Sequence, residues 1–96
     1  MIRVSVLYPS SAGSTFDHEY YKNSHVPMAV RGWSPISTQI DKGINGPYEA
    51  AVHFTFASLE KFQECMGLPI TAELAADLPN YTNIEAVIQI AEIVED

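Results

Sequence analysis

Asn45 and Gly46 stand between two strand-like stretches and constrain the fold more than any other residues. An Asn-Gly pair is among the strongest hairpin signals, because both residues tolerate the positive φ of a tight turn. The stretch before it, Trp33–Asp41, contains Pro35, which suits a strand start or an edge strand. We therefore predict two antiparallel neighbours. The stretch after the turn, Tyr48–Phe56, alternates, with Tyr48, Ala50, Val52, Phe54 and Phe56 on one face.

Helix and strand signals flank this hairpin on both sides. Ile2–Tyr8 is rich in Val and Ile with period two, which predicts a strand. Asp17–Arg31 has a helical pattern, and Ser58 is a good N-cap for a second helix. We expect Thr71 to cap a third, short helix and Glu85–Ile93 to form the last strand. The predicted order is strand, helix, strand, strand, helix, short helix, strand.

This order indicates an α+β fold: a ferredoxin-like split βαβ sandwich with one four-stranded antiparallel sheet. The helices can cover one face of the sheet, yet apolar residues occur on both. Val6 stands beside Leu7, and Val87 stands beside Ile88. An uncovered apolar face marks an interaction surface, and the same face of a second copy is its simplest cover. We therefore predict a homodimer through the sheet face.

Length and composition limit the classes of function. The 96 residues predict a single domain spanning 1–96. The formal charge of −7 argues against nucleic acid or an anionic membrane as partners, since both favour a basic surface. Cys65 is the single cysteine, so no internal disulfide is expected. Neither a secretion signal nor an apolar run near the ~20 residues of a membrane span occurs, and we expect a cytoplasmic protein.

The first helix contains a proline near its middle. Asp17 can accept hydrogen bonds from the free N–H groups of the first turn. Pro27 has no N–H and disfavours helical dihedrals for Val26. The sequence therefore predicts a kink at His25–Val26, a restart at Pro27, and an end at Arg31 and Gly32.

His25 lies beside the predicted break, on the same side as Tyr21 four residues earlier. One interpretation is a capping or core histidine that satisfies a carbonyl freed by the proline. The other is a general base or substrate-binding group, because a free imidazole titrates near pH ~6.5 and exchanges protons at neutral pH. The residues around it leave both open.

A pocket should lie between the sheet and its helices if the other sheet face is used by a second copy. Buried tyrosines are good pocket candidates, because each hydroxyl needs a polar partner. Phe54 and Phe56 fit a plain core role better. The aromatic candidates for the pocket are Tyr8, Tyr20, Tyr21, Trp33, Phe54, Phe56 and Tyr81.

Metal and cofactor signatures do not occur in the sequence. His18 and His25 are seven residues apart, roughly 10 Å along a helix at ~1.5 Å per residue. That is too far for one ion with ligands at ~2.1 Å. No glycine-rich nucleotide signature is present. We expect neither a metal nor a tightly bound cofactor. His53 is predicted to lie on the sheet face opposite Phe54, at the dimer interface, with a second pocket group as the alternative.

Three segments form a specific combination: Phe16-Asp17-x-x-Tyr20-Tyr21-x-x-x-His25-x-Pro27-Met28, Asp77-Leu78-Pro79-Asn80-Tyr81-Thr82 and Ile88-Gln89-Ile90. With Phe54-Thr55-Phe56-x-Ser58-Leu59-Glu60 they make the chain resemble the EthD family over essentially its whole length. The resemblance implies a dimeric α+β barrel, in which two ferredoxin-like sheets pack together. It also implies a link to ethyl tert-butyl ether degradation, or to cofactor-free enzymes acting on anthrones, muconolactones or related cyclic compounds.

In some of these relatives a histidine matching His25 is implicated in proton transfer. We therefore expect a homodimer that binds an apolar cyclic or carbonyl-containing metabolite, as a cofactor-free isomerase, oxygenase or reductase-associated protein. His25 would move a proton and Tyr21 would orient it or the substrate. The alternatives are a non-catalytic accessory or ligand-binding dimer, and a structural dimer with a filled interior. The expected substrate-binding residues are Tyr8, Tyr20, Trp33, Phe56 and Tyr81.

Overall fold

The computed structural model describes residues 1–95 and places four strands in one antiparallel sheet of order β2-β3-β1-β4. Gly46 adopts φ 129° in the loop between β2 and β3, a conformation that favours glycine. The predicted α+β class and antiparallel hairpin are thus confirmed. The strands are β1 Ile2–Pro9, β2 Ser37–Lys42, β3 Tyr48–Phe56 and β4 Val87–Glu92.

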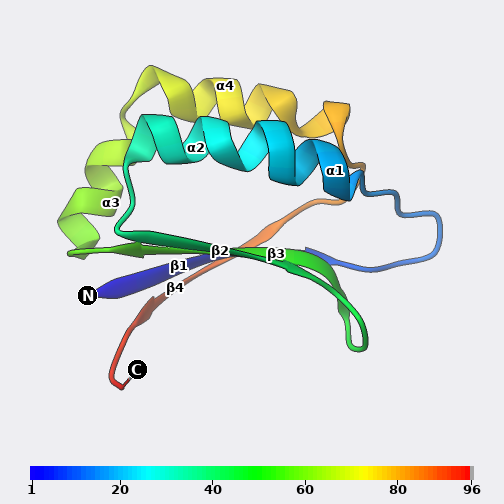
Figure 1. Cartoon of the computed structure of the whole chain (residues 1–96), viewed down its shortest axis with the longest axis horizontal. Coiled ribbons are helices and arrows are strands. Elements are labelled where there is room, and N and C mark those ends of the chain that lie inside the picture. The colour runs from blue at the N-terminus through cyan, green and yellow to red at the C-terminus, as the bar shows by residue number, and fades with distance from the viewer. Residues whose placement is uncertain (96) are drawn as a thin grey trace.

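The helices lie in a layer on one face of the sheet, and the other face is bare (Figure 1). One continuous helical segment crosses the sheet first, and a second run of helices returns beside it. No helix within residues 1–95 is long and apolar enough to cross a membrane. The helices are α1 His18–Tyr20, η1 Tyr21–His25, α2 Val26–Trp33, α3 Leu59–Met66, α4 Pro69–Asp77 and η2 Leu78–Asn80.

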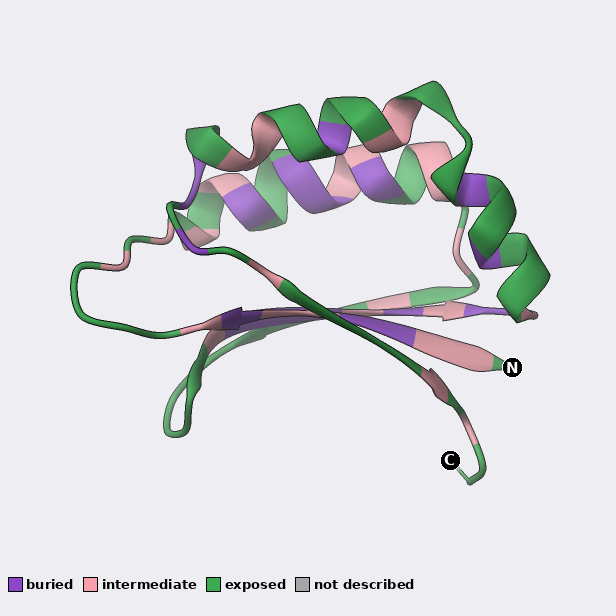
Figure 2. Ribbon diagram, turned by 180° about the vertical axis from the view of Figure 1, so that it is seen from behind, coloured by how far each residue is buried: buried purple, intermediate pink, exposed green. Residues whose placement is uncertain are grey.

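Strand register assigns the two sheet faces. Val4 pairs with Phe54 and Val6 pairs with Val52, and Val4, Val52 and Phe54 are among the most buried residues. Figure 2 shows buried residues on the helices and strands where the two layers meet. Residues one step out of this register, including His53, lie on the bare face. The core is therefore one layer between sheet and helices, and the candidate pocket belongs there.

The predicted kink at His25–Val26 is wrong. Val26 has helical dihedrals, with φ −64° and ψ −42°, and its N–H donates to the carbonyl of Tyr21, five residues back. Tyr21–His25 is therefore a π-helical turn, and Pro27 occupies the first turn of α2. The shift of hydrogen-bond register accommodates the missing N–H of the proline without breaking the helix. Such wide turns are frequent at functional sites.

Three predicted boundaries also move. The first helix runs to Trp33 and ends at Ser34, which adopts the left-handed cap conformation with φ 50°. Burial explains the extension, because the Trp33 ring packs edge-on against Phe54 at a centroid distance of 5.5 Å. Strand β2 consequently begins at Ser37. Helix α4 begins at Pro69 and not after Thr71, because proline suits the first helical turn. The last strand is Val87–Glu92, shorter than predicted.

Gly32 is an interior residue of α2 and packs against α4. A Cβ atom built at Gly32 would lie 2.7 Å from two side-chain carbons of Ile70. The sequence pattern assigned Gly32 to the helix end, but its role is to allow the two helices to approach closely.

We predict that Gly32→Ala destabilises the protein by about 1 kcal/mol, because overpacking outweighs the better helix propensity of alanine. Chemical denaturation would measure the change. Ile70→Ala should remove the clash, so the double variant should be more stable than the sum of the two single effects. Strict additivity would contradict this role for Gly32.

Candidate functional site

A cavity of about 350 Å³ lies between the helices and the inner face of the sheet. This volume falls at the lower end of the ~300–1,000 Å³ that small-molecule sites occupy. The interior therefore holds a cavity, which favours a ligand site over the purely structural interpretation. The residues that line it are Val4, Val6, Tyr8, Tyr21, His25, Val26, Ala29, Trp33, Val52, Phe54, Phe62, Met66, Thr71, Leu74, Ala75, Leu78, Glu85, Ala86 and Ile88.

His25 is the buried histidine of the cavity wall, with 8% of its surface exposed. Its ring comes from the last residue of the π-helical turn, so the wide turn fixes where the imidazole points. Nδ1 lies 2.8 Å from Oδ2 of Asp77, and Nε2 lies 3.3 Å from the hydroxyl of Tyr81. Both ring nitrogens thus contact side chains and not freed backbone carbonyls, which favours a functional role over capping.

Asp77 holds the imidazole from the end of α4. Its other carboxylate oxygen accepts hydrogen bonds from the Tyr20 hydroxyl at 2.7 Å and the Asn80 amide at 2.9 Å. An ionised carboxylate can only accept hydrogen bonds, so Nδ1 of His25 must donate. The proton of the neutral ring is therefore on Nδ1, and the lone pair is on Nε2.

Tyrosine hydroxyls continue the chain of hydrogen bonds beyond Nε2. Tyr81 donates to the unprotonated nitrogen, and the hydroxyls of Tyr81 and Tyr8 are 2.8 Å apart. Tyr21 stacks on the His25 ring with a centroid distance of 5.5 Å and an interplanar angle of 13°. Tyr8, Tyr81, His25 and Asp77 thus form one hydrogen-bonded line, with Tyr8 and His25 at the cavity wall.

Burial controls the ionisation of this group. Burial lowers the pKa of His25 from 6.5, and the opposing effect of Asp77 is smaller. Burial opposes ionisation of Asp77, but hydrogen bonds from Asn80, His25 and Tyr20 outweigh it and lower its pKa. Burial also raises the pKa values of Tyr8, Tyr21 and Tyr81. At neutral pH the site therefore holds an ionised Asp77, a neutral imidazole and neutral phenols.

The sequence-predicted residues fall into three groups: those that line the cavity, those behind its wall, and Phe56, which lies elsewhere in the core. Tyr8, Tyr21, His25, Phe54 and Trp33 line the cavity. Tyr20 and Tyr81 lie behind the wall, where their hydroxyls contact Asp77 and His25.

Phe56 is not among the lining side chains. It lies at the end of β3 and packs against Phe62 with a centroid distance of 5.5 Å, beneath α3. Phe56 therefore does not line this cavity and its substrate contact stays a prediction, while its packing agrees with the core role that its apolar pattern also suggested.

Asp77 is the residue that sequence reasoning missed as a functional group. A signal was present, because an acidic residue at a helix C-terminus faces the negative end of the helix dipole. Such a residue needs a compensating partner from elsewhere. The partner, His25, is 52 residues away in the sequence, and no local pattern connects them.

His53 lies outside the cavity, on the bare face of the sheet. Nδ1 contacts the Ser5 hydroxyl at 2.7 Å, and Nε2 contacts Asp41 at 3.0 Å. The three residues come from three adjacent strands, where the backbone N–H groups nearby belong to the sheet ladder. The hydrogen bonds join the three side chains to one another, so we interpret this line of residues as a satisfied polar patch.

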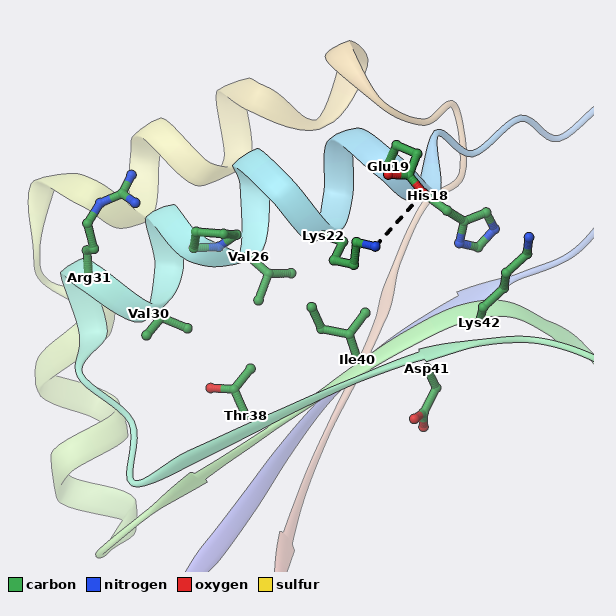
Figure 3. Close-up of a pocket in the computed structure, with 11 residues that line it drawn as sticks. His18, Glu19, Lys22, Val26, Val30, Arg31, Thr38, Ile40, Asp41 and Lys42 are labelled. Carbon is green, nitrogen blue, oxygen red and sulfur yellow. Dashed lines mark ion pairs between the residues drawn. The ribbon is translucent and has the colours of Figure 1, made fainter.

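A shallow groove of about 700 Å³ runs along the edge strand β2, beneath α1 and α2. Figure 3 shows Val26 above Ile40 and Val30 above Thr38, with Lys42 and His18 at one end and Arg31 at the other. Within residues 1–95, no cluster of three His, Cys, Asp or Glu side chains could hold a metal ion, in the groove or elsewhere.

Comparison with solved structures gives close neighbours. An EthD-like protein from Ralstonia eutropha is 36% identical, with a TM-score of 0.90 over 99% of this chain and 93% of that one. An ethyl tert-butyl ether degradation (EthD) family protein from Bacillus halodurans is 16% identical, with a TM-score of 0.76 over 96% and 97% of the two chains.

A dimeric protein of unknown function with a ferredoxin-like fold, from Bacteroides fragilis, is 11% identical, with a TM-score of 0.62 over 95% and 94% of the chains. The last two similarities concern the fold alone. No family model and no curated protein matches the chain.

The direction of the His25 pKa predicts how stability depends on pH. Because this pKa is lowered in the folded state, the unfolded chain binds a proton first as pH falls below 6.5. We expect the stability of the wild type relative to His25→Asn to decrease from pH 7.5 to pH 5, by at most about 1.4 kcal/mol per pH unit. Urea denaturation of both proteins across this range would measure the gap. If the stability of the wild type relative to His25→Asn instead increased toward low pH, the effect of Asp77 on the pKa of His25 would outweigh that of burial.

Proposed function

The chain belongs to the EthD family, and from this premise we propose that it binds an apolar cyclic or carbonyl-containing metabolite and catalyses proton transfer on it through His25. The observation that carries the proposal is the position of His25. Its ring lines a cavity of ligand size, while Asp77 fixes the proton on Nδ1. Nε2 is then the basic nitrogen, as a general base requires.

The proposed reaction is an isomerisation through an enol. Nε2 of His25 removes a proton from the carbon next to the substrate carbonyl, and the C–H electron pair becomes the enol double bond. Once the substrate displaces Tyr81 from Nε2, the Tyr8 hydroxyl is released from Tyr81 and donates its proton to the carbonyl oxygen. In a β,γ-unsaturated ketone, His25 returns its proton to the γ-carbon as the C=C bond shifts into conjugation, the enol O–H proton returns to Tyr8, and the carbonyl group and the resting protein are restored.

Other side chains of the site hold the base and the substrate in place. Asp77 stabilises the imidazolium that forms when His25 takes the proton, at a distance of 2.8 Å. Tyr21 stacks on the imidazole and limits its rotation, and Tyr81 occupies Nε2 until a substrate arrives. Trp33 supplies an apolar wall, with its indole N–H already donated to Thr71.

We also propose that two copies associate through the bare face of the sheet. Val87 is 50% exposed there and pairs in register with Leu7. The polar patch of His53, Ser5 and Asp41 is hydrogen-bonded internally through both ring nitrogens of His53, which reduces the cost of covering it. The dimer would leave the helix layer free, and each protomer would keep its own cavity.

A simple bicyclic ketone tests the enzymatic proposal. We expect the wild type to accelerate hydrogen–deuterium exchange at the carbon next to the carbonyl of 2-tetralone, followed by NMR in D₂O. His25→Asn should slow exchange about 100-fold or more, since a positioned base contributes 10²–10⁴-fold. His53→Asn is the matched control and should exchange normally. Binding without exchange in the wild type would indicate a non-catalytic ligand-binding protein.

The pH profile of the same exchange identifies the base. Because burial lowers the pKa of His25, the rate should rise with pH and reach a plateau, with a midpoint below 6.5. A midpoint above 6.5 would contradict a buried imidazole as the base.

Two lysine variants test the dimer proposal. Light scattering after size exclusion should give the mass of two chains for the wild type and of one chain for Val87→Lys, because a lysine there would be buried without a partner. Ile44→Lys, at a fully exposed position of the β2–β3 loop, should remain a dimer. A dimeric Val87→Lys would place the interface elsewhere.

A further inference from the structure

In the part of the chain that the structure describes, the carboxylates at and behind the cavity wall are not matched by lysine or arginine side chains on that wall. His25 and Glu85 are the only ionisable side chains on its wall besides the tyrosines, and no lysine or arginine within residues 1–95 lines it. Behind His25 stands the carboxylate of Asp77. A ligand in this cavity therefore meets one negative charge behind the base and another at its rim, where Glu85 is exposed to solvent.

The cationic side chains gather on a different surface. Three of the five lysine and arginine residues, Lys22, Arg31 and Lys42, border the groove between α2 and β2. Figure 3 shows Arg31 at one end of this groove and Lys42 at the other. This groove is separated from the cavity by Val26, which lines both. The cavity thus receives no cationic partner from the side of the groove.

We infer that the cavity is selective for neutral ligands and that Glu85 is a specificity-determining residue that disfavours carboxylates. This inference rests on the proposed function, because it concerns the substrate of the same site. A carboxylate placed in the cavity would lose its water without gaining a positive partner, which is costly. A ketone or phenol of the same shape has no such cost and can accept or donate at the tyrosine hydroxyls.

The polar groups of the wall also limit where a ligand can form hydrogen bonds. Thr71 accepts from the indole of Trp33 at 3.0 Å and donates to the carbonyl of Cys65 at 2.6 Å, so both side chains are already paired. His25 and Tyr8 are paired through Tyr81 in the resting protein, and in the proposed mechanism the ligand displaces Tyr81 and forms its hydrogen bonds at this end. The favoured ligand is therefore a neutral, mostly apolar molecule with one oxygen-bearing end.

Two isosteric probes test this selectivity. 2-Acetylnaphthalene and 2-naphthoate differ by the replacement of a methyl group with a charged oxygen. By calorimetric titration at pH 8, we expect the ketone to bind at least about tenfold more tightly than the carboxylate, given the cost of an unpaired buried charge. Competition between the probes shows whether they share a site. Naphthoate binding that the ketone does not displace is assigned to the groove if the Lys42→Gln variant abolishes that binding.

Variants then test Glu85 itself. Glu85→Gln should raise the affinity for naphthoate in the cavity by roughly two- to fivefold, the range of an exposed charge interaction, and leave the ketone unchanged. Glu73→Gln is the matched control, because Glu73 is an exposed residue of α4 that does not line the cavity. It should change neither affinity.

The outcomes separate the two proposals. Equal, competitive binding of both probes would overturn the selectivity and leave the proposed ligand site intact. A preference for the ketone that Glu85→Gln does not reduce would overturn the role of Glu85. Failure of both probes to bind would overturn the proposed ligand site, and the selectivity with it.

Discussion

The hydrogen bond between Asp77 and His25 is the interaction on which the candidate site depends. It joins the end of α4 to the π-helical turn before α2, two segments that are distant in the sequence. Because the carboxylate can only accept, this single contact fixes the tautomer of the imidazole, its orientation and the position of its lone pair. The tyrosine hydroxyls beyond Nε2 then follow as a consequence of where that lone pair points.

Local irregularities of the helices maintain this contact. The helix widens to a π turn so that His25 reaches the cavity while Val26 stays helical. Asp77 sits at the unfavourable end of a helix dipole, where its three hydrogen bonds compensate. Close packing of Gly32 against Ile70 brings the two helices together. Local deviations of this kind concentrate where function requires them.

The sequence predicted the architecture well because strand alternation and the Asn-Gly turn are local signals. It predicted His25, Tyr8, Tyr21 and Trp33 as a group because aromatic and titratable residues are rare enough to stand out. It missed Asp77 as a functional group because the contact with His25 joins distant segments. It placed a kink at His25–Val26 because a change of hydrogen-bond register leaves no local signal. Phe56 also shows what a local signal cannot predict. Strand alternation placed its side chain on the correct face of the sheet, but its packing against Phe62 of α3 depends on the tertiary structure.

The central claim is that His25 is neutral at pH 7 with its proton on Nδ1 and its lone pair on Nε2. Nitrogen-15 NMR of the histidine rings tests it most directly, because the two ring nitrogens of each tautomer have distinct chemical shifts. His25→Asn and His53→Asn spectra would assign the signals. The account predicts a protonated Nδ1 and an unprotonated Nε2 for His25. A ring protonated on Nε2 alone, or on both nitrogens at pH 7, would contradict it.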